Sequence, residues 1–469
     1  MICFTCRHKW TIISKYNLKL ERWSHMLFTK DQLKKLIIPL IIEQVLSITV
    51  GMADTVMVSS AGEAAISGVS LVDMINGLLL AVFAALATGG AVVTAQYIGG
   101  RKIEKACESA KQLLIIAFFV SIGIMAICLV ANRGLLRLFF GSIDNDVMRN
   151  ATIYFRISSL SFPFMALYNA GAALFRVMGN SKISMKVSLL MNAINVAGNA
   201  LCIYGLKMGV EGVAIPTLVS RTVAAIVILK LVFDKRNQVH VRDFRMIPDF
   251  IMIKNILRIG VPSGIENGLF QLGRLLVVSI IAKFDNIQIA ANAVANSLDS
   301  MGCIAGQAMG LAMITVIGQC VGAQDEKQVR YYTKKLLKLT YLITFVINTC
   351  ILLTLPWILK IFSLKAETRE LAYILVMIHN GFAMLLWPSS FTLPNALRAC
   401  NDVKFVMFIS IFSMCVFRVV FSYIIGLGLG MGAIGVWIAM LMDWVFRVGC
   451  FIWRFASGGW RKFAGFTNS

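Results

Sequence analysis

Long apolar stretches alternate with short polar segments along most of the chain. A helix that crosses a bilayer needs about 20 consecutive, mostly apolar residues. The lengths of the apolar stretches and the turn residues between them predict twelve such helices. These spans cover residues 36–58, 70–98, 112–132, 153–175, 185–204, 212–233, 256–282, 288–318, 336–359, 371–397, 405–426 and 433–454. We therefore expect an all-α integral membrane protein with twelve transmembrane helices.

The composition agrees with a membrane protein. Of the 469 residues, 58% are hydrophobic and 14% are charged, and the mean hydropathy of +0.78 is too high for a soluble chain of this size. The formal net charge of +22 comes from lysines and arginines spread over short loops rather than from one basic patch, so no nucleic acid partner is expected. Most of these residues lie on the side of both termini, which predicts cytoplasmic termini. We expect a monomer in the plasma membrane.

A charged loop after the sixth span divides the spans six and six. We expect an N-terminal lobe at 36–233, a cytoplasmic linker at 234–255 and a C-terminal lobe at 256–454. The polar, basic segments at 1–35 and 455–469 are predicted to be cytoplasmic tails.

Three short motifs of the first half recur in the second half, in the same order. The separation between the two copies along the chain is nearly the same for all three motifs, which indicates a duplication. Because each half has six spans, both halves enter the membrane in the same orientation. We expect two six-helix bundles related by a pseudo-twofold axis along the membrane normal, with a cavity between them, an arrangement typical of transporters. The motif pairs are 95–105 with 318–327, 174–182 with 396–404, and 207–213 with 430–436.

Asp54 lies inside the first span, where a charged residue is unfavourable. An ionised carboxylate in hydrocarbon costs roughly 2.5–3.5 kcal/mol on insertion scales. Ser47, Gly51 and Asp54 follow helical spacing and form a small polar stripe. One interpretation places Asp54 at the outer interface or at a helix end. The other, which we favour, is that Asp54 lines a polar cavity and binds a cation or a proton.

Several motifs, taken as an ordered set, resemble the multidrug and toxic compound extrusion (MATE) family. The resemblance covers about residues 30–455. Its motifs are IIPLIIEQ and MADTVMV in the first span, TAQYIGG at the end of the second, FRVMGNSK after the fourth, NVAGNALCIYG in the fifth, GVEGVAIPT at the start of the sixth and IGVPSGIENGLFQLG in the seventh.

This resemblance implies export of cationic or amphipathic compounds, driven by inward flow of Na⁺ or H⁺, with two lobes alternating about a central cleft. It also implies an N-terminal-lobe cation site built from an acid of span 1, two polar residues of span 5 and a threonine of span 6. The matching residues are Asp54, Asn195, Asn199 and Thr217. No other cofactor is expected.

The positions of these residues agree with one site. With a helical rise of about 1.5 Å per residue, Asp54, Asn199 and Thr217 fall in the outer half of the membrane, and Asn195 shares one face of span 5 with Asn199. A carboxylate with amide and hydroxyl oxygens suits a hard cation such as Na⁺. A single carboxylate balances one Na⁺, which favours Na⁺, although the same acid could carry a proton. The alternative for the asparagines is helix–helix hydrogen bonding.

The C-terminal half contains a second polar stripe, on spans 7 and 8. Asp299 has two open interpretations, a bridge to Arg274 or a substrate contact. Glu266 could meet a cationic compound or reach water, and a cation site in this lobe is doubtful because span 10 offers only His379 and Asn380. The candidates for a substrate cavity are Gln44, Glu266, Gln271, Arg274, Asn292, Asn296, Asp299 and His379.

Two rival functions remain. A flippase for lipid-linked oligosaccharide would need clustered arginines for a pyrophosphate. We count only Arg221, Arg274 and Arg418 as available to line the cleft, and we assign the other arginines to the loops and the ends of the spans. A membrane-embedded enzyme is disfavoured because the chain has neither an HExxH nor a GxSxG motif. The expected function is therefore antiport of small molecules, with the natural substrate and the choice of Na⁺ or H⁺ left open.

Overall fold

The computed structural model describes residues 26–60, 62–141, 144–242, 247–362 and 364–466, and every regular element in these ranges is helical. The first half contains α2 (Lys30–Ser59), α3 (Glu63–Gly99), α4 (Ile103–Val130), α5 (Asn132–Phe140), α6 (Asn145–Leu160), α7 (Phe162–Val177), α8 (Ser181–Ala200), η1 (Leu201–Gly205) and α9 (Glu211–Val232).

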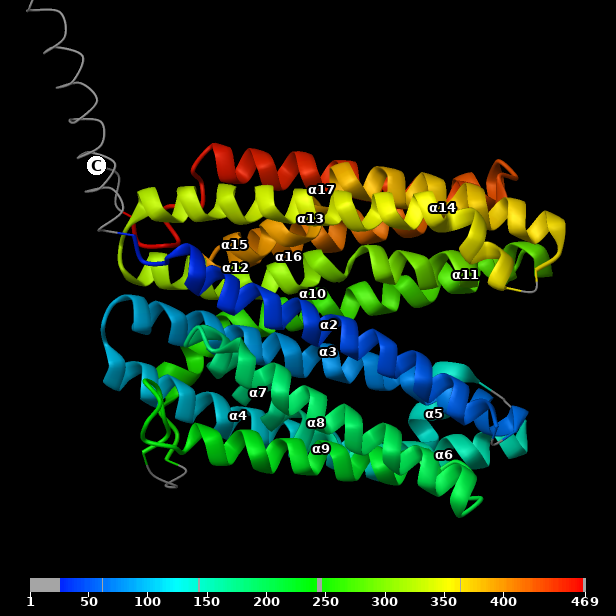
Figure 1. Ribbon diagram of the computed structural model, residues 1–469, viewed down its shortest axis with the longest axis horizontal. Helices are drawn as coiled ribbons and strands as arrows, with labels where there is room; N and C mark the ends of the chain where they lie inside the picture. The colour runs from blue at the N-terminus through cyan, green and yellow to red at the C-terminus, as the bar shows by residue number, and fades with distance from the viewer. Residues whose placement is uncertain (1–25, 61, 142–143, 243–246, 363, 467–469) are drawn as a thin grey trace, which may run out of the picture.

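The second half repeats the arrangement as a second bundle, drawn above the first in Figure 1. It contains α10 (Phe250–Ile281), α11 (Asn286–Gly302), α12 (Ile304–Gly322), α13 (Glu326–Ile361), α14 (Ala366–Trp387), η2 (Pro388–Thr392), α15 (Leu393–Ala399), α16 (Val403–Ser413), η3 (Met414–Val420), η4 (Ser422–Gly428) and α17 (Gly432–Ala456). The segments η1 to η4 are π-helical turns that continue the preceding helix.

Within the described residues, eleven helical segments are long and apolar enough to cross a membrane. The predicted span 153–175 is the exception, because the chain turns at Ser161 and two helices of 16 residues, α6 and α7, replace one long helix. Pro163 lies in the first turn of α7, where a missing N–H does no harm, but the same ring cannot continue α6. An all-helical membrane fold is thus confirmed.

Several helices begin before their apolar stretch does, because polar residues cap them. Thr29 accepts a hydrogen bond from the Gln32 backbone, and the Gln32 side chain accepts from Thr29 N–H in return, so α2 begins at a capping box. Asp325 likewise accepts from the backbone of Gln328 and starts α13 well before the predicted span at 336–359. Hydropathy alone therefore predicts the membrane-spanning segment but not the residue at which the helix begins.

The two lobes exchange the first turns of their first helices. Leu33, Leu36 and Leu40 of α2 belong to an apolar core formed with α12, α13 and α15 of the other half. Met252 and Ile256 of α10 belong in turn to the core of the N-terminal lobe. The predicted lobe boundary at residue 36 therefore separates segments that share a core, and each half contributes buried apolar area to the other.

Close backbone contact joins the lobes at the end of α3 and α12. A Cβ built at Gly99 would lie 1.9 Å from the Gln319 carbonyl oxygen, and one at Gly322 would lie 1.9 Å from that of Gln96. No larger residue fits at either position without backbone movement. The repeated Gln and Gly motif found in the sequence is thus one symmetric contact between the two halves.

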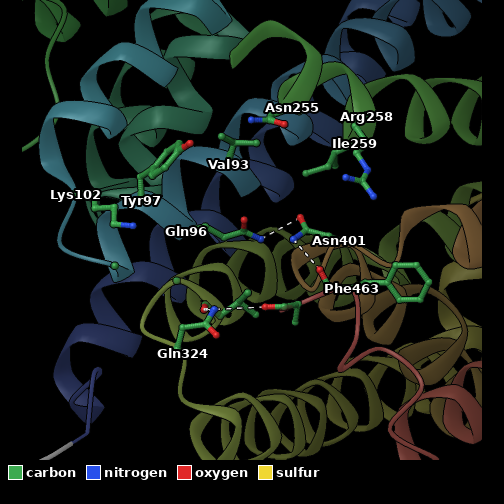
Figure 2. Close-up of a pocket in the computed structure, with 14 residues that line it drawn as sticks. Val93, Gln96, Tyr97, Lys102, Asn255, Arg258, Ile259, Gln324, Asn401 and Phe463 are labelled. Carbon is green, nitrogen blue, oxygen red and sulfur yellow. Dashed lines mark hydrogen bonds between the residues drawn. The ribbon is translucent and has the colours of Figure 1, made fainter. Parts of the chain in front are cut away.

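Side chains of the same motif strengthen this contact. Gln96 Nε2 donates to the Ala399 carbonyl at 3.0 Å and to Asn401 Oδ1 at 3.1 Å, as Figure 2 shows for Asn401. Gln319 Nε2 donates to the Val177 carbonyl at 2.6 Å. Each glutamine therefore reaches the end of a helix in the opposite lobe. Gln96 also lines a cavity of about 340 Å³ at this end of the molecule.

The segment after α17 is folded against the C-terminal lobe rather than free. The ring of Trp460 is fully buried and stacks on Phe455, while Arg461 forms an ion pair with Glu326 at 2.7 Å. Asn401 Nδ2 donates to the Phe463 carbonyl at 3.3 Å. The predicted C-terminal tail thus includes a packed turn up to the end of the described chain.

Candidate functional site

A polar cavity of about 320 Å³ lies inside the N-terminal lobe. Helices α2, α3, α6, α7, α8 and α9 contribute its walls. Its polar lining consists of Ser47, Asp54, Ser70, Asp73, Tyr154, Asn192, Asn195, Thr217, Ser220 and Arg221. The interior of one six-helix bundle therefore holds acids, amides and hydroxyls where apolar packing would otherwise be expected.

Asp54 is the centre of one cluster in this cavity. Asn199, which is fully buried on α8, donates from Nδ2 to Asp54 Oδ1 at 2.8 Å. The carboxylate is not at a helix end, because α2 continues to Ser59 beyond it, and it faces the interior of the bundle, because it lines the cavity. The structure therefore brings the acid of the first span directly against the amides of the fifth.

The Asn195 amide joins Asp54 to Thr217. With its nitrogen toward Asp54, it donates to the two carboxylate oxygens at 2.9 and 3.2 Å, and its oxygen accepts from Thr217 Oγ1 at 3.0 Å. The opposite orientation would set an amide oxygen against carboxylate oxygens, which is unfavourable. All four predicted cation-site residues, including Asn199, thus lie in one connected group.

One hydrogen-bond acceptor in this group has no donor among the described residues. Asn199 Oδ1 is buried and has no hydrogen-bond partner among the described residues. A buried amide oxygen without a donor is costly, and it lies in the same group as the Asp54 carboxylate and the Thr217 hydroxyl. Oxygen atoms of these three kinds match the ligands preferred by a hard monovalent cation. The described residues contain no group of three His, Cys, Asp or Glu side chains that could hold a metal.

Asp73 is a second acid in the same cavity, and the predicted span at 70–98 would place it near the start of a helix. The structure corrects this, because α3 begins at Glu63 and Asp73 lies within the helix. Asp73 Oδ1 accepts from the Tyr154 hydroxyl at 3.1 Å and from Asn76 Nδ2 at 3.3 Å. Arg221 faces the cavity from α9 and donates to Ser161 Oγ at 2.7 Å. The spacing of Asp73 gave no signal of these partners.

Two buried ion pairs occupy matching positions in the two lobes. In the N-terminal lobe, Arg176 Nη2 lies 2.6 Å from Glu43 Oε1, and Ser184 donates to the other carboxylate oxygen at 2.9 Å. In the C-terminal lobe, Arg398 Nη2 lies 2.7 Å from Glu266 Oε2. The two acids are separated along the chain by the same interval as the repeated motifs, and so, to within one position, are the two arginines. The duplication thus preserves a buried charge pair in each half.

A second cavity, of about 430 Å³, lies inside the C-terminal lobe. Four of the predicted substrate residues line it, namely Glu266, Arg274, Asn296 and Asp299. Sequence reasoning missed most of its other features. These are the arginines and aromatic rings contributed by α10, η2, α14, α15, η3 and α17, including Phe270, Trp387, Phe391, Arg398, Arg418, Trp444 and Arg447.

The proposed bridge between Arg274 and Asp299 does not form within the described part of the chain. Asp299 Oδ1 instead lies 3.0 Å from His379 Nε2 and accepts from Cys303 Sγ at 3.1 Å. The imidazole of His379 is buried between Trp437 and Trp444, with ring centroids 5.1 and 4.8 Å away. His379 therefore positions Asp299 from behind and does not line the cavity.

Three further candidates lie outside the residues that line this cavity. Asn292 is buried and accepts from Trp437 Nε1 at 3.0 Å, so it joins α11 to α17. Gln44 and Gln271 are partly exposed on their helices, and neither is among the lining residues of the cavities in the two lobes. Helical spacing placed these residues on a polar face. It could not distinguish a side chain packed between helices from one that lines a cavity.

Two helical bundles of like order, each with a polar cavity in the membrane interior, define a multi-pass membrane transporter. The chain belongs to the MATE family, since the family model MatE matches residues 39–201 and again residues 262–424. The two matches have equal lengths, and the second is offset from the first by the same interval as the repeated sequence motifs. The chain is therefore a transporter and not an enzyme.

Individual proteins agree with this assignment. The chain is 27% identical to the uncharacterized transporter YisQ of Bacillus subtilis, over 87% of this chain and 90% of that protein. It is 26% identical to the probable multidrug resistance protein NorM of Thermotoga maritima, over 94% and 95% of the two chains. A solved outward-facing structure of a multidrug resistance MATE transporter of the MOP superfamily has the same fold, with a TM-score of 0.85 and 23% identity over 92% of this chain and 96% of that one.

Proposed function

We propose that this protein is a secondary active antiporter that exports small amphipathic compounds in exchange for Na⁺ or H⁺. The observation that carries the proposal is the Asp54 carboxylate, which faces a polar cavity and contacts amides of α8. A charge in that position is unfavourable unless a cation or a proton neutralises it. The names of the relatives, among them a probable multidrug resistance protein, support drug-like substrates.

The four residues of the cation site would have different tasks. Asp54 supplies the negative charge, while Thr217 and the unpaired oxygen of Asn199 supply neutral ligands. Asn195 ties Asp54 on α2 to Thr217 on α9, so occupancy of the site changes how these two helices are linked. If the cation is a proton, it binds to the carboxylate, and the amide of Asn195 can turn to accept from it.

Alternating access requires that the lobes separate at one end while they close at the other. The structure is closed at the end where Gly99 and Gly322 contact the opposite backbone. By the distribution of basic residues we assign this end, both termini and the linker to the cytoplasm of a plasma-membrane protein. We further propose that the protein acts as a monomer, because each lobe encloses its own cavity.

The charge class of the exported compound is a separate question. The family resemblance implies cationic or amphipathic substrates, and Glu266 was a candidate either to meet a cationic compound or to reach water. Glu266 is 4% exposed and is already paired with Arg398 at 2.7 Å, so it offers little charge to a cationic ligand. We therefore assign the substrate by its amphipathic character here.

A flippase for lipid-linked oligosaccharide is the second candidate. The structure favours it in one respect, because Arg398 and Arg447 join Arg274 and Arg418 at the C-terminal cavity and form an arginine cluster. The cavity of about 430 Å³ fits a drug-sized molecule, which favours export of small compounds over a lipid-linked oligosaccharide. Movement of a fluorescent lipid-linked saccharide across proteoliposomes would support the flippase instead.

Transport in proteoliposomes tests the antiport. Efflux of an amphipathic dye should respond to an imposed Na⁺ or pH gradient, and comparison of the two gradients identifies the ion. Asp54→Asn should abolish this dependence, while the control Glu63→Gln, a change at the exposed start of α3, should preserve it. Undiminished coupled efflux by Asp54→Asn would refute the proposed site. Asn199→Ala should weaken the apparent affinity for the cation, and unchanged affinity would reduce Asn199 to a packing residue.

A further inference from the structure

Four arginines meet at the cavity of the C-terminal lobe, on four different elements. They are Arg274 of α10, Arg398 of α15, Arg418 of η3 and Arg447 of α17. Aromatic rings form much of the remaining wall. We propose that this cavity binds an aromatic organic anion, such as an aryl carboxylate, sulfonate or phosphate. This inference rests on the proposed function and names the charge class of its substrate.

The acids near the cavity neutralise these arginines only in part. Two acids, Glu266 and Asp299, are among the lining residues. Glu266 pairs with Arg398, and Asp299 pairs with His379 rather than with an arginine. Asp443, which is fully buried behind the wall, lies 3.6 Å from Arg418 Nη1 and accepts from Ser413. With all three acids counted, the cavity keeps a net positive charge.

Arg274 is the arginine best placed to meet a ligand. Its side chain lines the cavity and is solvent-accessible there. It has neither an ion pair nor a hydrogen bond among the described residues. Its place on α10 is two helical turns beyond Glu266, so it lies on the same face of the helix. An unpaired guanidinium inside a membrane bundle is unfavourable, and a bound anion would neutralise it.

The buried arginines have donors to spare. Arg447 is 3% exposed, and its Nε and Nη1 groups have no acceptor among the described residues. The Nε groups of Arg398 and Arg418 also lack acceptors there. Unused N–H groups of buried guanidinium ions carry a free-energy cost that a carboxylate, sulfonate or phosphate would remove.

The aromatic lining favours a ligand with a ring. Trp387 and Phe391 stack with centroids 5.0 Å apart, and Phe270 meets Phe391 edge-on at 5.9 Å. The guanidinium of Arg447 lies 4.5 Å from the Phe391 ring centroid, and that of Arg418 lies 5.5 Å from that of Phe270. Charged donors and ring faces thus alternate along one wall, as a charged aromatic molecule requires.

The charge of the substrate has an electrical consequence. Export of a univalent cation in exchange for one Na⁺ or H⁺ moves no net charge. Export of a univalent anion in exchange for the same ion moves one negative charge out and one positive charge in. An inside-negative potential therefore drives both movements. The proposal therefore predicts that transport of the anion is electrogenic.

Binding to the purified full-length protein gives the first test. We would titrate 2-naphthoate and, as its matched cation, 2-naphthylmethylammonium, and measure both by calorimetry in detergent. The expected result is clear preference for the anion. Arg274→Gln should weaken naphthoate binding about ten- to a hundredfold, the range for a lost charge-assisted hydrogen bond. The control Arg369→Gln, in the same lobe but outside the cavity lining, should bind as the unaltered protein does.

Equal or stronger binding of the naphthylmethylammonium cation by the unaltered protein would overturn the proposal without any variant. Naphthoate affinity that does not change in a folded Arg274→Gln protein would overturn it as well. Arg274→Glu gives the converse check, since reversal of charge should shift preference toward the cation.

Proteoliposomes separate this proposal from the antiport itself. Naphthoate export should produce a current and should accelerate when a potassium–valinomycin potential is made negative on the cytoplasmic face. If gradient-driven export of cationic dyes occurs and naphthoate neither binds nor moves, the anion proposal fails alone. If naphthoate binds through Arg274 but its movement ignores both ion gradients, the proposed antiport fails and the binding site stands.

Discussion

The matched ion pairs allow a comparison in which each lobe serves as the control for the other. Arg176→Met removes the charged partner of Glu43 but keeps an apolar stem of similar length, and Arg398→Met does the same for Glu266. The two carboxylates differ in the partners that remain after the change. Glu266 keeps a second arginine, Arg447, at 3.9 Å, whereas the partner that Glu43 keeps among the described residues is the hydroxyl of Ser184 at 2.9 Å.

The difference in free energy follows from these contacts. Glu43 is 5% exposed, and removal of one partner from a buried ion pair costs about 3–5 kcal/mol because the other charge is left uncompensated. Arg176→Met should fall in that range. Arg398→Met should cost about 1–2 kcal/mol less, because Arg447 can move toward Glu266 and replace one charge-assisted hydrogen bond.

Equilibrium unfolding with SDS in mixed micelles, followed by tryptophan fluorescence, measures both losses. The double variants Glu43→Gln with Arg176→Met and Glu266→Gln with Arg398→Met complete two double-mutant cycles, and we expect the coupling energy to be larger in the first lobe. Equal losses in the two lobes, or a greater loss for Arg398→Met, would refute the role given to Arg447.

Two further predictions concern contacts outside the cavities. Gly99→Ala sets a methyl group against the Gln319 carbonyl and should lower the stability of the closed conformation by about 1–3 kcal/mol. Gly123→Ala, where a Cβ meets no neighbour, should leave the melting temperature unchanged or raise it, and equal effects of the two changes would contradict the close contact between the lobes. Tyr332→Phe removes a hydroxyl that accepts from Phe28 N–H at 3.0 Å and donates to its carbonyl at 2.7 Å, which should cost about 1–3 kcal/mol. Limited proteolysis should then cleave the N-terminal segment faster, and an unchanged rate would show that this contact does not hold the segment.

The sequence predicted the membrane fold well because hydropathy and repeat spacing record it directly. Each of the twelve predicted spans corresponds to one helix or to successive helical segments, and the duplication appears again in the two family matches. Hydropathy does not record caps or breaks. The turn at Ser161 depends on Pro163 and on the hydrogen bond from Arg221, which lies far along the chain on α9.

The sequence predicted the residues of the N-terminal cavity better than those of the C-terminal cavity. The N-terminal group was expected because Asp54 is costly in lipid and the span 5 asparagines share one face, although its grouping with Thr217 came from a family resemblance. The C-terminal cluster was missed, since its arginines lie on separate elements and only packing unites them. Arg398 and Arg447 were also assigned outside the membrane or near its edge, which hid their role.

The paired charges in matching positions have a consequence for the history of the chain. In a six-helix ancestor with one such pair, the buried Glu and Arg would neutralise each other, so this ancestor could enter a membrane on its own. Two copies could then associate and exchange their first turns as a homodimer. Fusion would require only a connecting peptide, after which each copy was free to specialise. The cavity of the N-terminal lobe could then keep its acids, while the cavity of the C-terminal lobe acquired arginines.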